Sequence, residues 1–264
     1  MAELIRYAVG VEYLGSAFSG WQSLPGRRTV QATIEVALSK VAAQALNVIA
    51  AGRTDAGVHA VQQVAHFESS AERSAYAWLM GANSQLPADV SLRWIETVSP
   101  RFHARHDARR RHYRYVIHNH RTRSALLSQR AAWWPQPLDT AAMHVAAQQL
   151  LGEHDFSAFR DSQCQSPTPM RRLDAISVRR HRDLVVVDVS GNAFLHHMVR
   201  NIVGTLALVG LGKQPVAWVA EVLASRDRRC AGMTAPADGL YFVGPEYPAE
   251  FALPAPPALV FPPV

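Results

Sequence analysis

The order of hydrophobic patterns along the first hundred residues is the feature that most constrains the fold. Apolar residues at alternate positions indicate a strand, and apolar residues three and four apart indicate a helix. In chain order these patterns predict a strand at 6–13, a helix that follows Thr29 as its N-cap, strands at 46–51 and 63–68, a helix at 76–84 and a strand at 90–98. The first half therefore has the order β-α-β-β-α-β.

The same order recurs in the second half of the chain. The patterns predict a strand at 111–119, a helix at 138–151, strands at 175–182 and 184–190, a helical stripe over 195–209, a short helix after Pro215 and a last strand at 240–243. Two ferredoxin-like halves with mainly antiparallel sheets, an α+β fold, are the simplest architecture that fits. We expect the halves to span 1–104 and 105–247 and to flank a basic cleft, with 248–264 as a loosely held Pro-rich tail.

Composition excludes several classes of protein. With 48% hydrophobic and 18% charged residues among 264, the chain can bury a core and is not disordered. The longest apolar stretch, Ile202–Leu211, is too short to span a bilayer, and Glu3 and Arg6 interrupt any signal peptide. Cys164 and Cys230 are too few for a disulfide framework or a cysteine-based zinc site. We expect a cytoplasmic protein.

Positive charge is concentrated in one stretch. The net charge is +6, and Arg101–Arg130 holds nine arginines and one acidic residue, Asp107, so the whole surplus lies there. A mutational bias explains why 25 of the 27 basic residues are arginine, but it does not explain this placement. Clustered arginines that neutralise phosphates release counterions, so the stretch points to a polyanion as partner.

The loop AGRTDAGVHA, residues 51–60, joins two predicted strands. Gly52 and Gly57 permit a tight backbone, so the loop can present Asp55 sharply. Arg53, two residues earlier, would favour the ionised carboxylate if both side chains lie on one face, and an ionised aspartate in a cleft can act as a nucleophile. The alternative is that Asp55 only caps a turn and pairs with Arg53.

Aromatic residues alternate with arginines in the basic stretch. FHAR (102–105) is followed by RRRHYRYVIHNH (109–120). Unpaired RNA bases stack on aromatic rings while phosphates meet guanidinium groups, so the pattern suits RNA. The alternative for Tyr113 and Tyr115 is the core face of a strand, and a strand that runs from the core into a cleft satisfies both interpretations.

A third segment, GNAFLHHMVRNIVGTL (191–206), places Arg200 away from the apolar stripe of its helix. There it could hold a phosphate, pair with an acid such as Asp55, or be an ordinary surface arginine. His196 and His197 are adjacent, and His103 and His106 are three apart, but no H-E-x-x-H motif or cysteine pair accompanies them. We expect neither a metal nor a cofactor, because the nucleotide-binding glycine motifs are also missing.

Together these segments resemble the tRNA pseudouridine synthase A family over residues 4–245. The matching motifs, in the order expected for that family, are FSGWQ (18–22), RTVQATIEVALSKV (28–41), GRTDAGVHA (52–60), FHAR (102–105), YRY (113–115), DFSAFR (155–160), GNAFLHHMVRNIVGTL (191–206) and TAPADGLYF (234–242). The sequence departs from the family in having Tyr-Leu-Gly at 13–15 where many members have Tyr-Asp-Gly. That change could weaken one RNA contact and leaves the catalytic set intact.

The resemblance implies an isomerase that converts uridine to pseudouridine at positions 38, 39 and 40 of the tRNA anticodon arm, as a homodimer, without cofactor or metal. It implies Asp55 as nucleophile, with Arg53 and Arg200 beside it, Tyr113 packed on the target base and Leu240 helping to hold that base. We also expect contacts to RNA from Arg109, Arg110, Arg111 and His59. The alternatives are a non-catalytic RNA-binding protein with the same basic cleft and a metal-dependent nuclease or deaminase.

Overall fold

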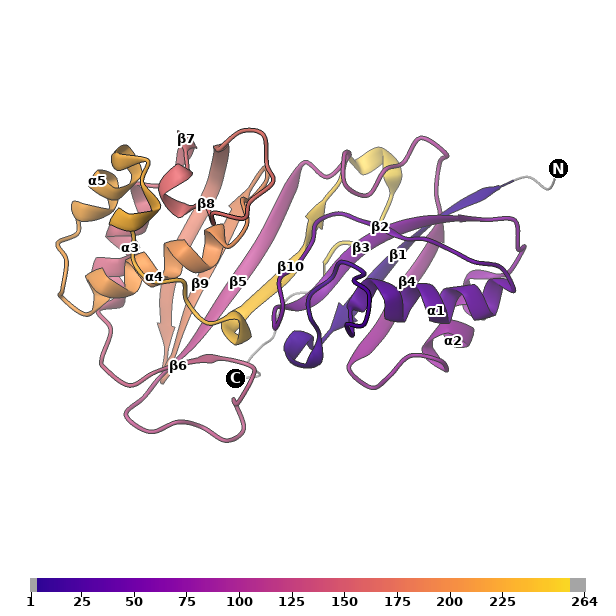
Figure 1. The fold of residues 1–264 in the computed structure, drawn as a ribbon, viewed down its shortest axis with the longest axis horizontal. Coiled ribbons are helices and arrows are strands. Elements are labelled where there is room, and N and C mark those ends of the chain that lie inside the picture. Colours follow the sequence, from indigo (N-terminus) through magenta and orange to yellow (C-terminus); the bar gives the residue numbers. More distant parts are fainter. Residues whose placement is uncertain (1–3, 257–264) are drawn as a thin grey trace. The chain divides into compact units, whose positions relative to one another are not determined.

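The computed structural model describes residues 4–256, and its internal contacts divide the chain into two units (Figure 1). Unit 1 contains the residues up to Arg109 and from Tyr241 onward, and unit 2 is Arg110–Leu240. The sequence placed this boundary at 104/105 and assigned the last strand to the second half. The difference arises because the Phe102–Ala104 segment packs in the core of unit 1, and because the last strand pairs there as well.

Unit 1 has the predicted element order. It comprises β1 (Ile5–Tyr13), α1 (Val30–Ala42), β2 (Ile49–Ala50), β3 (His59–Ser69), α2 (Ala75–Asn83), β4 (Val90–Thr97) and, from its second residue onward, β10 (Leu240–Glu246). Its strands follow the order β4-β1-β3-β10, and β2 also pairs with β3. All pairs are antiparallel except β3 with β10. The α+β class and the mainly antiparallel pairing are therefore confirmed.

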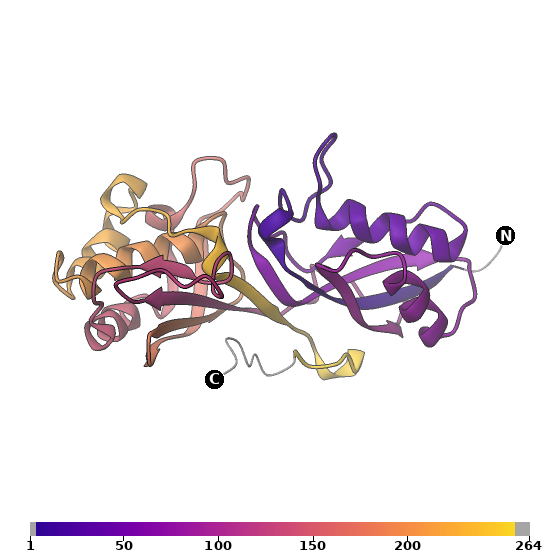
Figure 2. The ribbon, with the colours of Figure 1, turned by 90° about the horizontal axis from the view of Figure 1, so that it is seen from below.

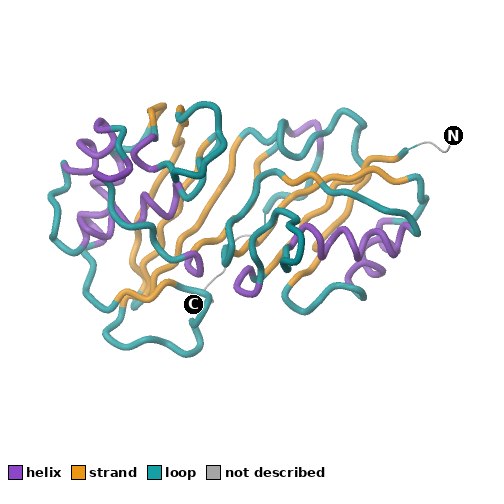
Figure 3. Tube along the Cα trace, viewed as in Figure 1, coloured by secondary structure: helices purple, strands orange, loops and turns teal. Residues whose placement is uncertain are grey.

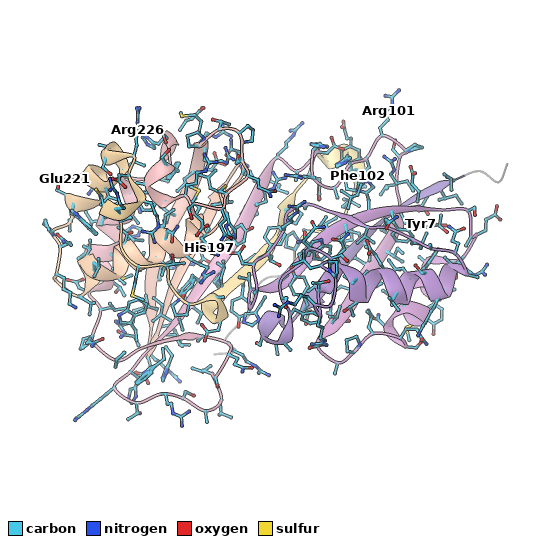
Figure 4. The ribbon with its side chains drawn as sticks, in the orientation of Figure 1. Tyr7, Arg101, Phe102, His197, Glu221 and Arg226 are labelled. Atoms are coloured by element: carbon cyan, nitrogen blue, oxygen red, sulfur yellow. The ribbon has the colours of Figure 1, made fainter. Side chains whose placement is uncertain are left out.

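Both faces of the unit 1 sheet are covered. On one face Trp78 of α2 packs against Tyr7 and Phe67, with ring centroids 5.3–5.4 Å apart. On the other face Phe102 contacts Tyr247 and Phe251 at 5.1 and 5.0 Å (Figure 4 labels Tyr7 and Phe102). Trp78 and Phe102 meet their partners in the tilted or edge-on geometry that aromatic rings prefer, and Tyr7 and Phe67 are stacked on each other.

The segment after β10 supplies part of that second face. Figure 2 shows the yellow end of the chain running from β10 into the short helix at Ala249–Phe251. Leu253 joins the same core, and the Gln62 side chain donates to the carbonyl of Pro254 at 3.0 Å. Phe251 and Leu253 are half-buried against this core, whereas Ala252, Pro254 and Ala255 are exposed, so contacts hold part of the segment expected to be loose. Residues 257–264 lie outside the described part of the chain.

Unit 2 contains β5 (Arg110–Asn119), β6 (Ala132–Trp134), α3 (Thr140–Gln148), β7 (Gly152–Asp155), β8 (Met170–His181), β9 (Leu184–Gly191), α4 (Met198–Gly210) and α5 (Trp218–Ser225). Its strands follow the order β5-β9-β8-β7, and β6 pairs in parallel with β5. Strands β6 and β7 were not predicted, and Figure 3 shows the loop that leads from β5 to β6.

Helix α4 lies at the centre of unit 2. Eleven of its thirteen residues are buried, including the polar Asn201 and Thr205. Asn201 donates to the carbonyl of Phe159 at 2.9 Å, and Thr205 accepts from the backbone of Gly232 at 3.0 Å, so both buried polar groups are satisfied. Among the described residues, no helix is both long and apolar enough to cross a membrane.

Candidate active site

Asp55 lies in a tight turn between β2 and β3. The turn is closed by the Val58 N–H, which donates to the Asp55 carbonyl at 3.2 Å. Gly57 has φ 81°, a left-handed conformation that favours glycine. The Asp55 side chain is half-buried and Arg53 is exposed. The turn that sequence reasoning offered as the alternative is thus present, and it leaves the carboxylate accessible.

A neighbouring loop, residues 15–21, fixes the backbone of the Asp55 turn. Trp21 donates its N–H to the Thr54 carbonyl at 3.0 Å, and Gly57 donates to the Phe18 carbonyl at 3.3 Å. Glycine is required at two points of this contact. A Cβ on Gly15 would meet the Val58 carbonyl oxygen, and one on Gly20 would lie 2.8 Å from the Thr54 carbonyl oxygen. The FSGWQ motif therefore braces the Asp55 turn.

Side chains beneath the loop complete its support. The hydroxyls of Tyr13 and Thr54 share a buried hydrogen bond of 2.8 Å, and Gln63 donates to the Gly52 carbonyl at 2.6 Å. Burial raises the pKa of Tyr13 far above its ordinary value, although hydrogen bonds with Thr54 and Gln63 oppose this, so the phenol stays neutral. The loop is held by neutral hydrogen bonds and close packing.

His59 has a different role from the expected contact with RNA. Its side chain is 1% exposed, and its Nδ1 accepts the Gly15 N–H at 2.9 Å. The ring also packs against Tyr241 of β10, with centroids 4.6 Å apart. His59 therefore joins the bracing loop to the sheet, and a buried ring occupied in this way is not a surface for substrate.

In unit 2, Tyr113 is half-buried on β5, and its ring meets Phe194 edge-on, with centroids 5.0 Å apart. Tyr115, two residues on, is fully buried, and its hydroxyl donates to the Pro236 carbonyl at 2.7 Å. Burial raises the pKa of Tyr115 well above its ordinary value, with Asp238 adding to the effect. Tyr115 is thus a core residue, whereas Tyr113 forms part of an aromatic surface. Sequence reasoning missed Phe194, because one aromatic residue in a loop carries no periodic signal.

Arg200 occupies the first turn of α4. Its Nε donates to the Ala235 carbonyl at 2.7 Å, and the Ala235 N–H donates back to the Arg200 carbonyl at 3.1 Å. Burial raises the pKa of Asp238, although backbone hydrogen bonds and the positive charge of Arg200 act to lower it. The segment TAPADGL thereby aligns Arg200. Leu240, at the end of this segment, is 5% exposed.

Comparison with known proteins agrees with these motifs. A family model described as tRNA pseudouridine synthase matches residues 10–107 and 146–248. A protein of Cronobacter sakazakii named tRNA pseudouridine synthase A is 53% identical over 96% of this chain and 94% of its own length. One of the same name from Xanthomonas campestris is 54% identical over 95% of this chain and 98% of its own. The chain belongs to the tRNA pseudouridine synthase family. It is an isomerase of that family.

One solved structure with a weak likeness adds nothing to this family assignment. A putative M16-like peptidase from Alicyclobacillus acidocaldarius covers 85% of this chain and 76% of its own, with 10% identity and a TM-score of 0.17. A likeness that weak carries no argument about fold or function.

The arginines of the basic stretch are divided between the units of this pseudouridine synthase family member. Arg101, Arg105 and Arg109 belong to unit 1, and the other six belong to unit 2. Seven of the nine are exposed, and Figure 4 shows Arg101 reaching outward. Arg110 forms an ion pair with Asp174, and Arg111 donates to the Asn192 carbonyl at 2.8 Å. These two bonds hold the start of β5, so the stretch has a structural role in addition to any contact with RNA.

The predicted site residues are distributed as follows: Asp55, Arg53, His59 and Arg109 lie in unit 1, and Tyr113, Arg200, Leu240, Arg110 and Arg111 lie in unit 2. Within unit 1 the structure connects the Asp55 loop to His59 through the loop at 15–21. Within unit 2 it pairs Tyr113 with Phe194 and Arg200 with Ala235. Each unit thus carries its own preorganised set.

Proposed function

We propose that this protein converts uridine to pseudouridine at positions 38, 39 and 40 in the anticodon arm of tRNA, without a cofactor. The observation that carries the proposal is the Asp55 turn. A half-buried carboxylate stands on a backbone that is fixed by hydrogen bonds from the FSGWQ loop. A fixed carboxylate suits covalent catalysis, because holding reacting groups in place supplies part of the activation free energy.

The target base must leave the helical stack before a side chain can reach its glycosidic bond. The Asp55 carboxylate then either attacks C1′ of the ribose or assists loss of the C2′ proton. The bond between N1 and C1′ breaks, the uracil turns, and C5 bonds to C1′. The C5 proton is lost and N1 gains a proton, so substrate and product are isomers and no oxidant or reductant is needed.

The remaining roles follow from residue type. Arg53 and Arg200 hold the Asp55 carboxylate through charge-assisted hydrogen bonds or hold the phosphate of the flipped nucleotide. Tyr113 packs on the uracil, and its hydroxyl serves as the general base for the C5 proton. Leu240 gives an apolar wall that retains the detached base. The edge-on ring of Phe194 fixes the orientation of Tyr113.

The partner is tRNA, bound through phosphate contacts from the exposed arginines of the basic stretch. Because the chain resembles the members of this family, we infer that the protein acts in the cytoplasm as a homodimer. Sedimentation of the protein with and without tRNA measures both its oligomeric state and its stoichiometry.

Release of tritium from tRNA labelled at uridine C5 tests the proposed chemistry. The wild-type protein should release tritium in the presence of a chelator, and mapping should find pseudouridine at positions 38–40. Binding of tRNA without tritium release would favour a non-catalytic RNA-binding protein. Loss of activity on chelation would favour metal-dependent chemistry.

A further inference from the structure

Two adjacent histidines precede α4 in unit 2. The rings of His196 and His197 are stacked, with centroids 3.9 Å apart and an interplanar angle of 25°. Both face Asp161: Nδ1 of His197 lies 2.9 Å from Oδ2, and Nδ1 of His196 lies 3.3 Å from Oδ1. This cluster joins the loop that follows Phe159 to the beginning of the helix that carries Arg200.

The Asp161 carboxylate is itself fixed in place. Its Oδ1 accepts the Gln163 N–H at 2.9 Å, and its own N–H donates to the His196 carbonyl at 3.2 Å. Burial would raise the pKa of Asp161, but the bonds from Gln163 and His197 outweigh burial and lower it. An ionised carboxylate with a fixed backbone is a rigid acceptor for an imidazole N–H.

His197 has an unusual backbone conformation. It is the N-cap of α4 and has φ 59° and ψ 3°, in the left-handed region. A side chain with a Cβ is disfavoured there, so the conformation needs support from its surroundings. The His197 carbonyl accepts the Asn201 N–H at 2.9 Å, which forms the first helical turn, and Arg200 lies within that turn. Figure 4 labels His197.

We propose that Asp161 is a positioning residue: through its contact with His197 it holds the left-handed N-cap of α4 and so aims Arg200. This inference rests on the proposed function. Neither Asp161 nor His197 takes part in proton transfer under this proposal. Their effect passes through the backbone, because a shift at the N-cap would turn Arg200 away from its bond with the Ala235 carbonyl. A displacement of about 1 Å at a reacting group can lower turnover about 100-fold.

Comparing His197→Gly with His197→Ala tests the proposal. Glycine removes the ring but adopts the left-handed conformation freely, whereas alanine keeps the conformational cost without the contact to Asp161. We expect kcat for tritium release to fall about 10-fold in His197→Ala and to stay within about 3-fold of wild type in His197→Gly, with KM for tRNA unchanged in both. Equal and large losses in both variants would show that the ring itself is needed and would overturn the proposal.

A double-mutant cycle tests the role of Asp161. Asp161→Ala should lower kcat about 10-fold in the wild-type background and less than about 2-fold in the His197→Gly background, because Asp161 then has no strained N-cap to hold. An equal loss in both backgrounds would overturn the proposal. Arg182 supplies the control, since it has φ 51° in the turn between β8 and β9. Arg182→Ala and Arg182→Gly should differ in thermal unfolding and not in kcat.

The outcomes separate this inference from the proposed function. A wild-type protein that releases no tritium contradicts the proposed function. An active wild type whose His197→Ala variant has unchanged kcat contradicts the positioning role alone. Thermal unfolding of every variant is measured alongside, and a fall in kcat that merely follows the fraction unfolded also counts against the positioning role.

Discussion

The Asp55 turn in unit 1 and the start of α4 in unit 2 are held by different kinds of contact. Around Asp55 the support comes from backbone hydrogen bonds, from glycines that let two chain segments approach closely, and from the neutral side chains of Tyr13 and Gln63. At α4 the support comes from side chains, with Asp161 facing two histidines. The contacts that hold the Asp55 turn are uncharged and need glycine at the points of close approach. The contacts that hold the start of α4 include the carboxylate of Asp161.

The histidines show the same contrast. In unit 1, His59 and His66 each accept a backbone N–H through Nδ1, from Gly15 at 2.9 Å and Ala104 at 3.1 Å. An accepting nitrogen carries no proton, so these contacts require a neutral ring. In unit 2, His196 and His197 instead face the carboxylate of Asp161.

Replacing Asp55 removes the proposed nucleophile and should leave the supports of its loop intact. Those supports are backbone bonds and the contact between Tyr13 and Thr54. We expect Asp55→Asn to lower the rate of pseudouridine formation at least about 1,000-fold with tRNA affinity unchanged, as measured by tritium release and filter binding. The exposed turn residue Asp183 provides a matched control, since Asp183→Asn should match wild type. Parallel loss of binding and activity would instead assign Asp55 a structural role.

Adding one methyl group at Gly15 tests the backbone support of the Asp55 turn. The new Cβ would meet the Val58 carbonyl oxygen, so the two segments must separate. We expect Gly15→Ala to lower kcat about 10- to 100-fold through displacement of the turn. Gly26→Ala is the control: Gly26 has φ 70° but no atom within 4 Å of the added Cβ, so only a backbone cost of about 1 kcal/mol in unfolding applies. Similar kcat values for the two variants would refute the bracing role of the 15–21 loop.

Neutralising the basic stretch tests whether it binds RNA in addition to holding β5. We expect substitution of Arg109, Arg110 and Arg111 by Gln to weaken tRNA binding about 10-fold and to reduce the salt slope by about one for each lost phosphate contact. Arg73→Gln, an exposed change outside the stretch, should leave both unchanged. A triple variant with lower thermal stability and unaltered salt slope would mean that these arginines serve only the fold.

The need for a neutral His66 predicts that stability depends on pH. Burial lowers the pKa of His66 to about 4, and the charges of His103 and Arg6 add to this. In the unfolded chain His66 binds a proton near pH 6.5, whereas in the folded chain it does so only near pH 4. The stabilisation that the neutral His66 ring contributes is therefore complete above about pH 6.5 and is lost as the pH falls toward 4. We expect the free energy of unfolding to drop by about 2 kcal/mol between about pH 7.5 and 5.

Denaturant unfolding at both pH values measures this loss. His66→Gln has no titrating ring, so its free energy of unfolding should depend much less on pH over the same interval. A wild type and a His66→Gln variant with equal pH dependence would place the sensitive group elsewhere in the chain.

Much of the fold is predictable from the sequence because burial imposes a period on long elements. Helix α1 buries residues three and four apart, and strand β9 buries every second residue, so both patterns stand out. Strands β6 and β7 are three and four residues long and have no such pattern. The predicted strand at 46–51 shrinks to Ile49–Ala50, because Leu46 and Val48 are buried without pairing in a strand.

The site was predictable to the extent that motifs mark it. The GRTDAGVHA motif locates Asp55 in a turn, but no sequence pattern reveals that His59 points inward to Gly15. Asp161 lies 36 residues from His197, and their contact depends on tertiary packing alone. The proline content after Tyr247 suggested a loose tail, whereas Phe251 and Leu253 are held by their apolar surface. Composition describes a segment's average, and single apolar side chains decide whether it packs.

The return of the chain to unit 1 affects the order in which the molecule can be completed. The sheet of unit 1 ends with β10, whose Tyr241 pairs with His59 beside the bracing loop. During synthesis this strand emerges only after all of unit 2 has been made. A chain released before Tyr241 would contain the whole GRTDAGVHA motif but would lack strand β10 and the contacts of Tyr247 and Phe251 with Phe102. The Asp55 turn is encoded early and gains its full support late, so truncated products should carry the motif without activity.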